Sequence, residues 1–463
     1  MNQNSEERLG TAKMLPLVFK MAVPSVIAQL VNLLYSIVDR IYIGHIPQHG
    51  TDALAGIGIT GSIIILISAF SSLAGGGGAP LAAIALGKND RDRAEKILAN
   101  CFTMLLFFAA VSMAAAYIFK GDILWAIGAD SDTFGYADSY LSVYLLGTVF
   151  VMISVGLNGL ITCQGRSGTA MISVVMGALI NIVLDPIFIF VLKMDVAGAA
   201  LATVISQACS AVFVLIFLFS KKATLRIRIS KMAPDFRIIG SIAALGMAPF
   251  VMAATESMIG FVLNSGLQHY GGKLYVSALT VLQSVMQLST VPLNGFGQGV
   301  SPIISYNYGA GKTERVKEAY KILLAVSFGF QFVMVLSMLV FPSFYASMFT
   351  DDSMLIELVS DVMPLFMTGA LIFGLQRACQ NTFVALGQSK ISLFIALLRK
   401  VILLIPLAII LPKFFGVNSI YLAESIADAT AAIICITLFC IRFPKIMAKC
   451  EKSTQNIQES KGE

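Results

Sequence analysis

Twelve long apolar segments limit what this chain can fold into. Each is longer than about 20 residues, the length of α-helix that crosses the hydrocarbon core of a bilayer. The segments are continuously apolar rather than alternating, which favours membrane helices over strands. They cover residues 16–41, 54–84, 95–119, 137–163, 168–192, 196–220, 238–266, 274–304, 318–343, 356–386, 390–412 and 417–441.

The composition also indicates an integral membrane protein. Of the 463 residues, 57% are apolar and 13% are charged, which is about half the charged share of a soluble domain. These charged residues are too few to cover the surface of a soluble protein of this size. We therefore exclude a soluble enzyme, a nucleic-acid-binding protein and a disordered chain, and we expect a lipid bilayer around the helices.

The distribution of Lys and Arg predicts the orientation of the chain. Basic residues gather in alternate loops and at the C-terminal end, whereas the intervening loops carry few. The positive-inside rule places the basic loops in the cytoplasm. Both termini then lie in the cytoplasm, which requires an even number of spans and agrees with twelve. We expect a multi-pass protein of the cell membrane, either the inner or the plasma membrane.

The two halves of the chain repeat one another. GKNDRDRAEKIL at 87–98 matches GKTERVKEAYKIL at 311–323, and GRS at 165–167 matches GQS at 387–389. Six spans precede the second copy, so the halves are parallel repeats, which in transporters enclose a substrate site. The expected fold is an all-α membrane protein, with two pseudo-symmetric six-helix bundles around a central cavity. The predicted divisions are an N-terminal tail (1–15), a first bundle (16–220), a linker (221–237), a second bundle (238–441) and a C-terminal tail (442–463).

Two acids inside the first bundle are the strongest functional signal. Ionisable residues within membrane helices are costly and mark functional sites by default. The topology places Asp39 and Asp185 at one depth, toward the outer ends of the first and fifth helices. Burial and mutual repulsion oppose the charging of both carboxylates, so one is expected to hold a proton or to share Na⁺.

Further oxygen ligands lie near these acids. Asn181 precedes Asp185 by four residues and therefore shares its helix face, and Thr203 lies about two turns into the sixth helix. Pro186 frees a backbone carbonyl in the preceding turn. Such hard oxygen ligands suit Na⁺ or a proton, and the alternative is a polar cluster that only joins helices. The predicted cation-coupling site, with no other metal and no cofactor, is Asp39, Asn181, Asp185 and Thr203.

The second bundle keeps the repeated prolines but not these acids, since Asn264 and Ile405 stand at the positions that match Asp39 and Asp185. Its own acid in the seventh helix is Glu256, and Arg377 lies in the tenth helix. We expect these two residues to form either a substrate site or a second cation site. Neutralisation of Glu256 by a nearby base is the alternative.

Four more charged residues lie within the second bundle. Glu424 and Asp428 are four residues apart on the twelfth helix, and neutralisation by a base is the favoured interpretation, with Arg377 as the base considered. Arg399 and Lys400 are adjacent on the eleventh helix. Neighbouring positions point about 100° apart, so at least one of them is expected to be structural rather than to face the cavity.

Two further features concern the shape of the helices. Pro24 and Pro186 are predicted to let the first and fifth helices bend during transport. Glycines at 75–78, 295, 297 and 299 occupy matching places near the inner ends of the second and eighth helices. They predict close packing or bending of these helices and not a phosphate-binding loop.

The sequence contains the motifs VDRIYIGHI at 38–46, CQGRSG at 163–168, NIVLDPIFIF at 181–190 and PLNGFGQGVSPIISYNYGAGK at 292–312. Through these motifs the chain resembles the multidrug and toxic compound extrusion (MATE) family over roughly residues 15–440, and its small bacterial MepA-like branch in particular. The resemblance implies export of organic, often cationic, drugs by a monomer, with Na⁺ or H⁺ as the coupling ion. It also implies that the four predicted cation-site residues match the site of the N-terminal bundle, and that the acid at Glu256 lines the C-terminal cavity. Arg377 has no place in the family pattern.

The expected function is a secondary active exporter of small drug-like molecules that works by alternating access. One alternative is a flippase or exporter of lipid-linked or polysaccharide precursors, whose phosphates would require several Arg or Lys side chains facing the cavity. A more distant alternative is an integral membrane enzyme, which would require a reactive cluster that the sequence does not display.

Overall fold

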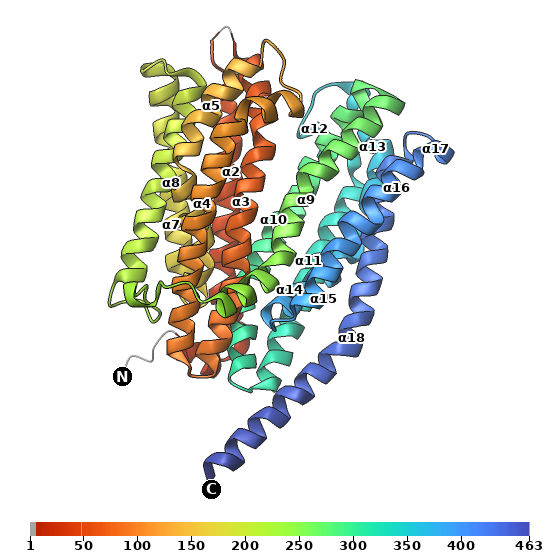
Figure 1. Cartoon of the computed structure of the whole chain (residues 1–463). Coiled ribbons are helices and arrows are strands. Elements are labelled where there is room, and N and C mark those ends of the chain that lie inside the picture. The colour runs from red at the N-terminus through yellow and green to blue at the C-terminus, as the bar shows by residue number, and fades with distance from the viewer. Residues whose placement is uncertain (1–5, 48, 463) are drawn as a thin grey trace.

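The chain is all-helical in a computed structural model that describes residues 6–47 and 49–462 (Figure 1). Residues 1–5 of the predicted N-terminal tail and Glu463 of the predicted C-terminal tail lie outside the described residues. The described residues contain no strand. Eleven of their helical segments are long and apolar enough to cross a membrane, and a bent helix pair brings the number to twelve. The predicted all-α membrane fold is confirmed.

The first half of the chain supplies six of these spans, and its fourth span is the bent pair of α5 and α6. The helices are α1 (Glu7–Thr11), α2 (Met14–Gly44), α3 (Gly50–Gly87), α4 (Arg91–Ile127), α5 (Phe134–Leu146), α6 (Thr148–Thr162), α7 (Ser167–Pro186), the π-helix η1 (Ile187–Val191) and α8 (Asp195–Phe219).

The second half repeats this arrangement with more interruptions. After the short 3₁₀-helix η2 (Ile229–Lys231), it contains α9 (Phe236–Gly271), α10 (Lys273–Gly309), α11 (Thr313–Val340), α12 (Pro342–Ser347), α13 (Ser353–Met367), the 3₁₀-helix η3 (Thr368–Ile372), α14 (Phe373–Ala385), α15 (Ser389–Leu397), the π-helix η4 (Leu398–Leu404), α16 (Ile405–Ile410), α17 (Pro412–Phe415) and α18 (Ser419–Gly462).

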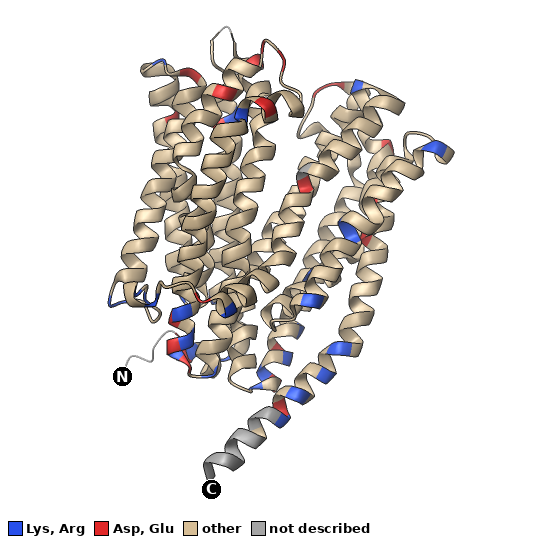
Figure 2. Cartoon of the chain, in the orientation of Figure 1, with Lys and Arg blue, Asp and Glu red and all other residues tan. Residues whose placement is uncertain are grey.

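The helices form two bundles, one from α2 to α8 and the other from α9 to α18 (Figure 1). Both ends of the chain lie at the same end of the molecule, where the bundles approach each other, and the bundles diverge toward the opposite end. Lys and Arg residues are concentrated at the end that carries the termini (Figure 2). This asymmetry is the one that the positive-inside rule uses to assign a cytoplasmic side.

Glycines allow the bundles to touch at the end that carries the termini. A Cβ atom added to Gly77 of α3 would lie 2.1 Å from the carbonyl oxygen of Ile242 in α9. The repeat-related contact joins α10 to α2, where a Cβ on Gly299 would lie 2.4 Å from the Cα of Ala22. The repeated glycines therefore serve close packing between the bundles.

Several helices depart from the straight spans that the sequence predicts. The span predicted at 137–163 is broken at Gly147, where α5 and α6 meet at 60°. Pro186 ends α7 and a π-helical turn follows it, whereas Pro24 lies inside the uninterrupted α2. In the second bundle the π-helix η4 ends just before Pro406. Such π-helical turns occur frequently at functional sites, and η1 and η4 both adjoin ionisable residues.

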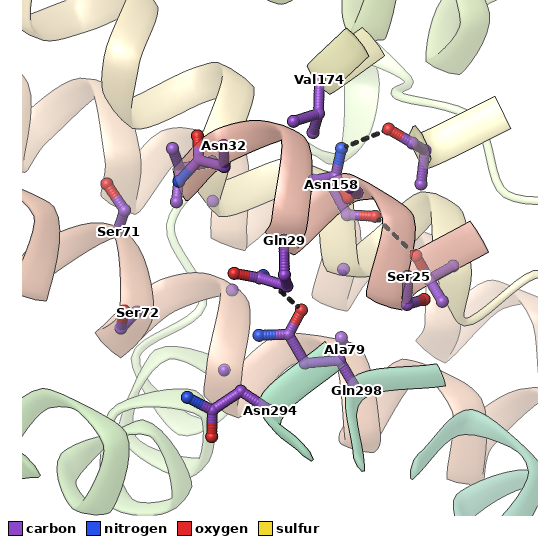
Figure 3. A pocket seen from close by; sticks show the side chains of 18 of the residues that line it. Ser25, Gln29, Asn32, Ser71, Ser72, Ala79, Asn158, Val174, Asn294 and Gln298 are labelled. Carbon is purple, nitrogen blue, oxygen red and sulfur yellow. Dashed lines mark hydrogen bonds between the residues drawn. The ribbon is translucent and has the colours of Figure 1, made fainter. Parts of the chain in front are cut away.

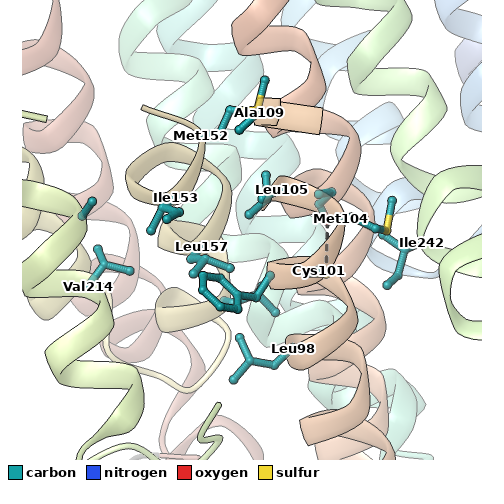
Figure 4. Packing of buried hydrophobic residues seen from close by; sticks show 14 of the residues in the cluster. Leu98, Cys101, Met104, Leu105, Ala109, Met152, Ile153, Leu157, Val214 and Ile242 are labelled. Atoms are coloured by element: carbon teal, nitrogen blue, oxygen red, sulfur yellow. Dashed lines mark hydrogen bonds between the residues drawn. The ribbon is translucent and has the colours of Figure 1, made fainter. Parts of the chain in front are cut away.

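The core of the first bundle is a dense apolar cluster that also holds the linker. Leu98 and Leu105 of α4 and Leu157 of α6 are fully buried in it (Figure 4). Leu225 of the linker packs into the same cluster, and its backbone N–H donates to the Oε1 of Gln164 over 3.0 Å. The linker between the bundles is thus part of the first bundle's packing.

Candidate functional site

A cavity of about 620 Å³ lies between the two bundles. This volume suits a drug-sized molecule. Helices of both bundles form its wall, and a hydrogen bond of 3.0 Å from Gln29 of α2 to Gln298 of α10 crosses between them (Figure 3). Much of the wall consists of hydroxyl and amide side chains, among them Ser25, Asn32, Ser71, Ser72, Asn158 and Asn294.

Only two of the described lining residues are charged. These are Glu256 of α9 and Arg377 of α14, the two residues that the sequence proposes as a substrate or second cation site. Both belong to the second bundle, so the part of the wall that the first bundle supplies is polar without being charged. The structure therefore places the predicted pair together at the cavity.

The four residues of the predicted cation site meet inside the first bundle. The amide nitrogen of Asn181 donates to the Oδ1 of Asp185 over 3.1 Å and to the Oγ1 of Thr203 over 3.4 Å. The carboxyl of Asp39, from α2, interacts directly with that of Asp185. Asp185, Asn181 and Thr203 are buried and Asp39 is half-buried.

Three oxygen atoms of this cluster are buried without a hydrogen-bond donor among the described residues. They are Asp39 Oδ1, Asn181 Oδ1 and Asp185 Oδ2. Burying an acceptor oxygen without a hydrogen-bond donor costs free energy. A bound proton or cation would give these oxygen atoms the partner that the described residues do not supply. The ligand set is entirely oxygen, which suits a hard cation such as Na⁺ as well as a proton. The chemistry of these residues therefore fits either coupling ion.

Two tyrosines belong to this region, and the sequence analysis missed both. Tyr35 precedes Asp39 by one helical turn of α2 and lines the cavity. Tyr140 of α5 reaches the hydroxyl of Thr203. The four-residue spacing to Asp39 is a sequence signal for Tyr35, but nothing in the sequence indicates Tyr140. Because the two acids do not line the cavity, Tyr35 is one connection between the cavity and the predicted cation site, and Ser206, which lines the cavity and donates to the carbonyl oxygen of Thr203 over 2.8 Å, is another.

The buried charges of the second bundle form ion pairs that correct the sequence-based assignment. The Nε of Arg399 lies 2.5 Å from the Oδ1 of Asp428, and its Nη2 lies 3.3 Å from the Oε1 of Glu424. Arg399, and not Arg377, is thus the base that neutralises the acids of α18. Lys400 pairs with Glu256, with 3.0 Å between Nζ and Oε2.

Arg399 and Lys400 are each 5% exposed, and neither is among the residues that line the cavity. That at least one of them is structural stays a prediction, which the burial of both residues away from the cavity wall supports. They sit in the π-helix η4, whose wider turn carries two adjacent basic residues toward acids on different helices. The extra residue of a π-helical turn shifts the direction of the side chains that follow it.

The fold and the cavity define an integral membrane transporter built from two repeated bundles. The sequence model of the MatE family matches residues 24–187 and 249–410, and the chain belongs to this family. It is a transporter and not an enzyme.

Known multidrug exporters are similar to this chain in sequence and in structure. The multidrug export protein MepA of Staphylococcus haemolyticus is 26% identical over 412 residues, which cover 89% of this chain and 90% of that protein. A crystal structure of MATE in the bent conformation matches with a TM-score of 0.90 at 21% identity, covering 97% of this chain and 100% of that chain. An outward-facing multidrug resistance MATE family transporter matches with a TM-score of 0.85 at 21% identity, covering 97% of each chain.

Proposed function

We propose that this protein is a secondary active multidrug exporter that exchanges organic, often cationic, drugs for Na⁺ or H⁺ by alternating access. The observation that carries the proposal is the cluster of Asp39, Asn181, Asp185 and Thr203, in which three buried oxygen atoms have no hydrogen-bond donor among the described residues. A polar cluster that only joined helices would pair its own acceptors. The relatives that carry the name multidrug export protein support the same function.

The proposed coupling works through α2. Asp39 lies on this helix, and Tyr35 one turn earlier lines the cavity. A cation that binds between Asp39 and Asp185 from the outer side cancels one of their two negative charges and draws α2 toward α7. This movement displaces Tyr35 and changes the cavity wall. The ion must bind the two conformations with different affinities, because otherwise it shifts no equilibrium.

The proposed setting is the plasma or inner membrane, with both termini in the cytoplasm. The concentration of Lys and Arg at the end that carries the termini supports this orientation. With this orientation the bundles touch on the cytoplasmic side and diverge on the outer side, as in an outward-facing state. The proposed divisions stay those of the sequence, with bundles at 16–220 and 238–441, a linker at 221–237 and tails at 1–15 and 442–463. The proposed working unit is a monomer.

The flippase alternative is less well supported by the cavity. Lipid-linked and polysaccharide precursors carry phosphates, and several basic residues would have to face them. Arg377 is the one basic residue among the described lining residues. Arg399 pairs with the buried acids of α18, and Lys400 does not line the cavity and is already paired with Glu256. The cavity therefore favours a smaller organic substrate.

Dye export from proteoliposomes tests the proposal. Ethidium movement is followed under a Na⁺ gradient, under a pH gradient and under neither. We expect movement under one gradient only, and loss of that movement in Asp185→Asn. The matched control is Asp361→Asn, an exposed acid of α13 remote from the cluster, which is expected to keep full activity. Full gradient-driven export by Asp185→Asn would contradict the proposed mechanism.

A further inference from the structure

We propose that Arg377 forms an anion-binding subsite in the central cavity, which receives the carboxylate group of an organic substrate. The inference rests on the proposed export function and narrows its substrate class. A subsite of this kind would not be expected in an exporter that selects its substrates for positive charge alone. Such selection would call for an unpaired acid on the cavity wall.

Of the two charged residues on the described cavity wall, Arg377 is the one without an ion-pair partner among the described residues. Glu256 is the only acid on the described part of the wall, and Lys400 already neutralises it at 3.0 Å. Arg377 forms neither a hydrogen bond nor a salt bridge with any side chain in the described part of the chain, and its Nε is buried without a partner. The cavity wall therefore presents one uncompensated positive charge.

The balancing negative charge lies deeper in the bundle. Glu424 and Asp428 both contact Arg399, so this group of three carries one more acid than base. All three side chains are at most 6% exposed. Three acids and three bases take part in this arrangement, so their charges sum to zero, but the surplus acid is buried and the surplus base faces the cavity. A ligand in the cavity thus meets the base.

Aromatic stacking holds Arg377 in place. Its guanidinium carbon lies 5.4 Å from the centre of the Phe373 ring, and that of Arg399 lies 4.4 Å from the same ring centre. Phe373 is 2% exposed, so the ring is fixed by its own packing. A guanidinium that stacks on a ring keeps its N–H donors free at the edge, where they match the two oxygens of a carboxylate.

The groups around Arg377 suit a carboxylate on a polar or zwitterionic molecule. Asn381 lies one turn further along α14 and also lines the cavity. Glu256 has a side chain that is 61% exposed, and its Oε1 makes no hydrogen bond with a described residue. An ammonium group on the substrate has this oxygen as a partner while the carboxylate binds Arg377. A single guanidinium offers one bidentate contact, which matches one carboxylate better than a pyrophosphate.

The test compares two dyes that differ only in this group. Rhodamine 110 carries a free carboxylate, and rhodamine 123 is its methyl ester. Equilibrium binding to the purified protein in detergent is measured by fluorescence anisotropy, without any ion gradient. We expect the protein to bind rhodamine 110 roughly tenfold more tightly than rhodamine 123, which corresponds to about 1.4 kcal/mol.

Substitution of the arginine should remove this preference. In Arg377→Gln the affinity for rhodamine 110 falls to that of rhodamine 123, whose own affinity stays the same or rises because a repulsive charge is gone. Arg377→Lys keeps the charge and retains part of the preference. The matched control is Arg93→Gln, an exposed arginine at the start of α4, which keeps the full ratio. Melting temperatures establish that each variant is folded.

Three results would overturn the proposal. They are equal or tighter binding of the ester by the wild-type protein, no binding of rhodamine 110, and an unchanged binding ratio in Arg377→Gln. If Arg377→Gln does not fold, the ratio of the two dye affinities is measured in Arg377→Lys instead. A ratio equal to that of the wild-type protein would then contradict the proposal. Failure of the export function is seen separately, as an absence of gradient-driven ethidium movement, because the binding assay uses no gradient.

Discussion

Gly246 of α9 lies directly against the backbone of Leu73 in α3, so closely that a Cβ atom on the glycine would be 1.8 Å from the leucine carbonyl oxygen. The two residues belong to different bundles, and each lies in the half of its helix nearer the end that carries the termini, since α3 ends there and α9 begins there. Because the obstacle is backbone and not a flexible side chain, a larger residue at 246 separates the helices. This contact therefore closes the cavity on that side.

Gly246→Ala is expected to open the molecule at the end that carries the termini. A clash of this kind costs about 1–3 kcal/mol, which is roughly tenfold or more in the population of the closed state. Distances between spin labels at Arg93 and Glu318, in a background without reactive cysteines, should lengthen. Gly240→Ala is the matched control on α9, since nothing lies within 4 Å of its added Cβ. Unchanged distances in Gly246→Ala would contradict the closing role.

Arg399→Met is expected to destabilise the second bundle. The substitution leaves Glu424 and Asp428 buried beside each other without a base. Breaking a buried ion pair from one side typically costs about 3–5 kcal/mol. The melting temperature in detergent should fall sharply, and the triple variant that adds Glu424→Gln and Asp428→Asn should recover much of the loss.

The control for this substitution is Arg442→Met, an exposed position further along α18. It removes the same side chain from a solvated site and should leave the melting temperature unchanged. Equal melting temperatures for Arg399→Met and the wild-type protein would show that the buried acids do not need this base.

Thr203→Val distinguishes the two coupling ions. The substitution removes a hydroxyl oxygen that lies 3.4 Å from the Asn181 amide but keeps the shape of the side chain. Export driven by Na⁺ should then require more Na⁺, because a ligand oxygen is lost, whereas export driven by protons should continue, because carboxylates carry the proton. Half-saturating Na⁺ and pH profiles in proteoliposomes measure this. Thr437→Val, at an exposed position on α18, should change neither.

Lys231 anchors the linker to the first bundle in a pH-dependent way. Its Nζ lies 2.7 Å from the Oδ1 of Asp92 and 2.8 Å from the Oε2 of Glu95. These hydrogen bonds raise the pKa of Lys231 above its ordinary value of 10.5. A raised pKa means that the stabilisation is fully present below the unfolded-state pKa and disappears as the pH rises through the folded-state value.

Lys231→Met should therefore melt at a lower temperature than the wild-type protein between about pH 7 and 9, where lysine is charged. The difference should shrink once the pH exceeds the ordinary pKa. Lys222→Met is the matched control, because this linker lysine is exposed and should have no effect at any of these pH values. A difference between Lys231→Met and the wild-type protein that grew with pH would contradict the ion-pair explanation.

The sequence alone was enough to group the four residues of the proposed cation site. Asn181 and Asp185 share a helix face because they are four residues apart, and the depth of each span places Asp39 and Thr203 at a similar level. The sequence does not indicate Tyr140, whose hydroxyl reaches Thr203 from a helix that is distant along the chain. Nor does it indicate the bend at Gly147 between α5 and α6, since both helices have the apolar composition of one continuous span.

The sequence by itself determined the number of spans, the duplication and the basic asymmetry of the loops, because bilayer thickness and the cost of burying charge act on each segment separately. Only the tertiary structure decided which charges meet. Arg399 reaches the acids of α18, Lys400 reaches Glu256, and Arg377 is left unpaired on the cavity wall. These partners lie on helices far apart in the chain. Their pairing depends on helix rotation and on the π-helical turn of η4, which no local pattern specifies.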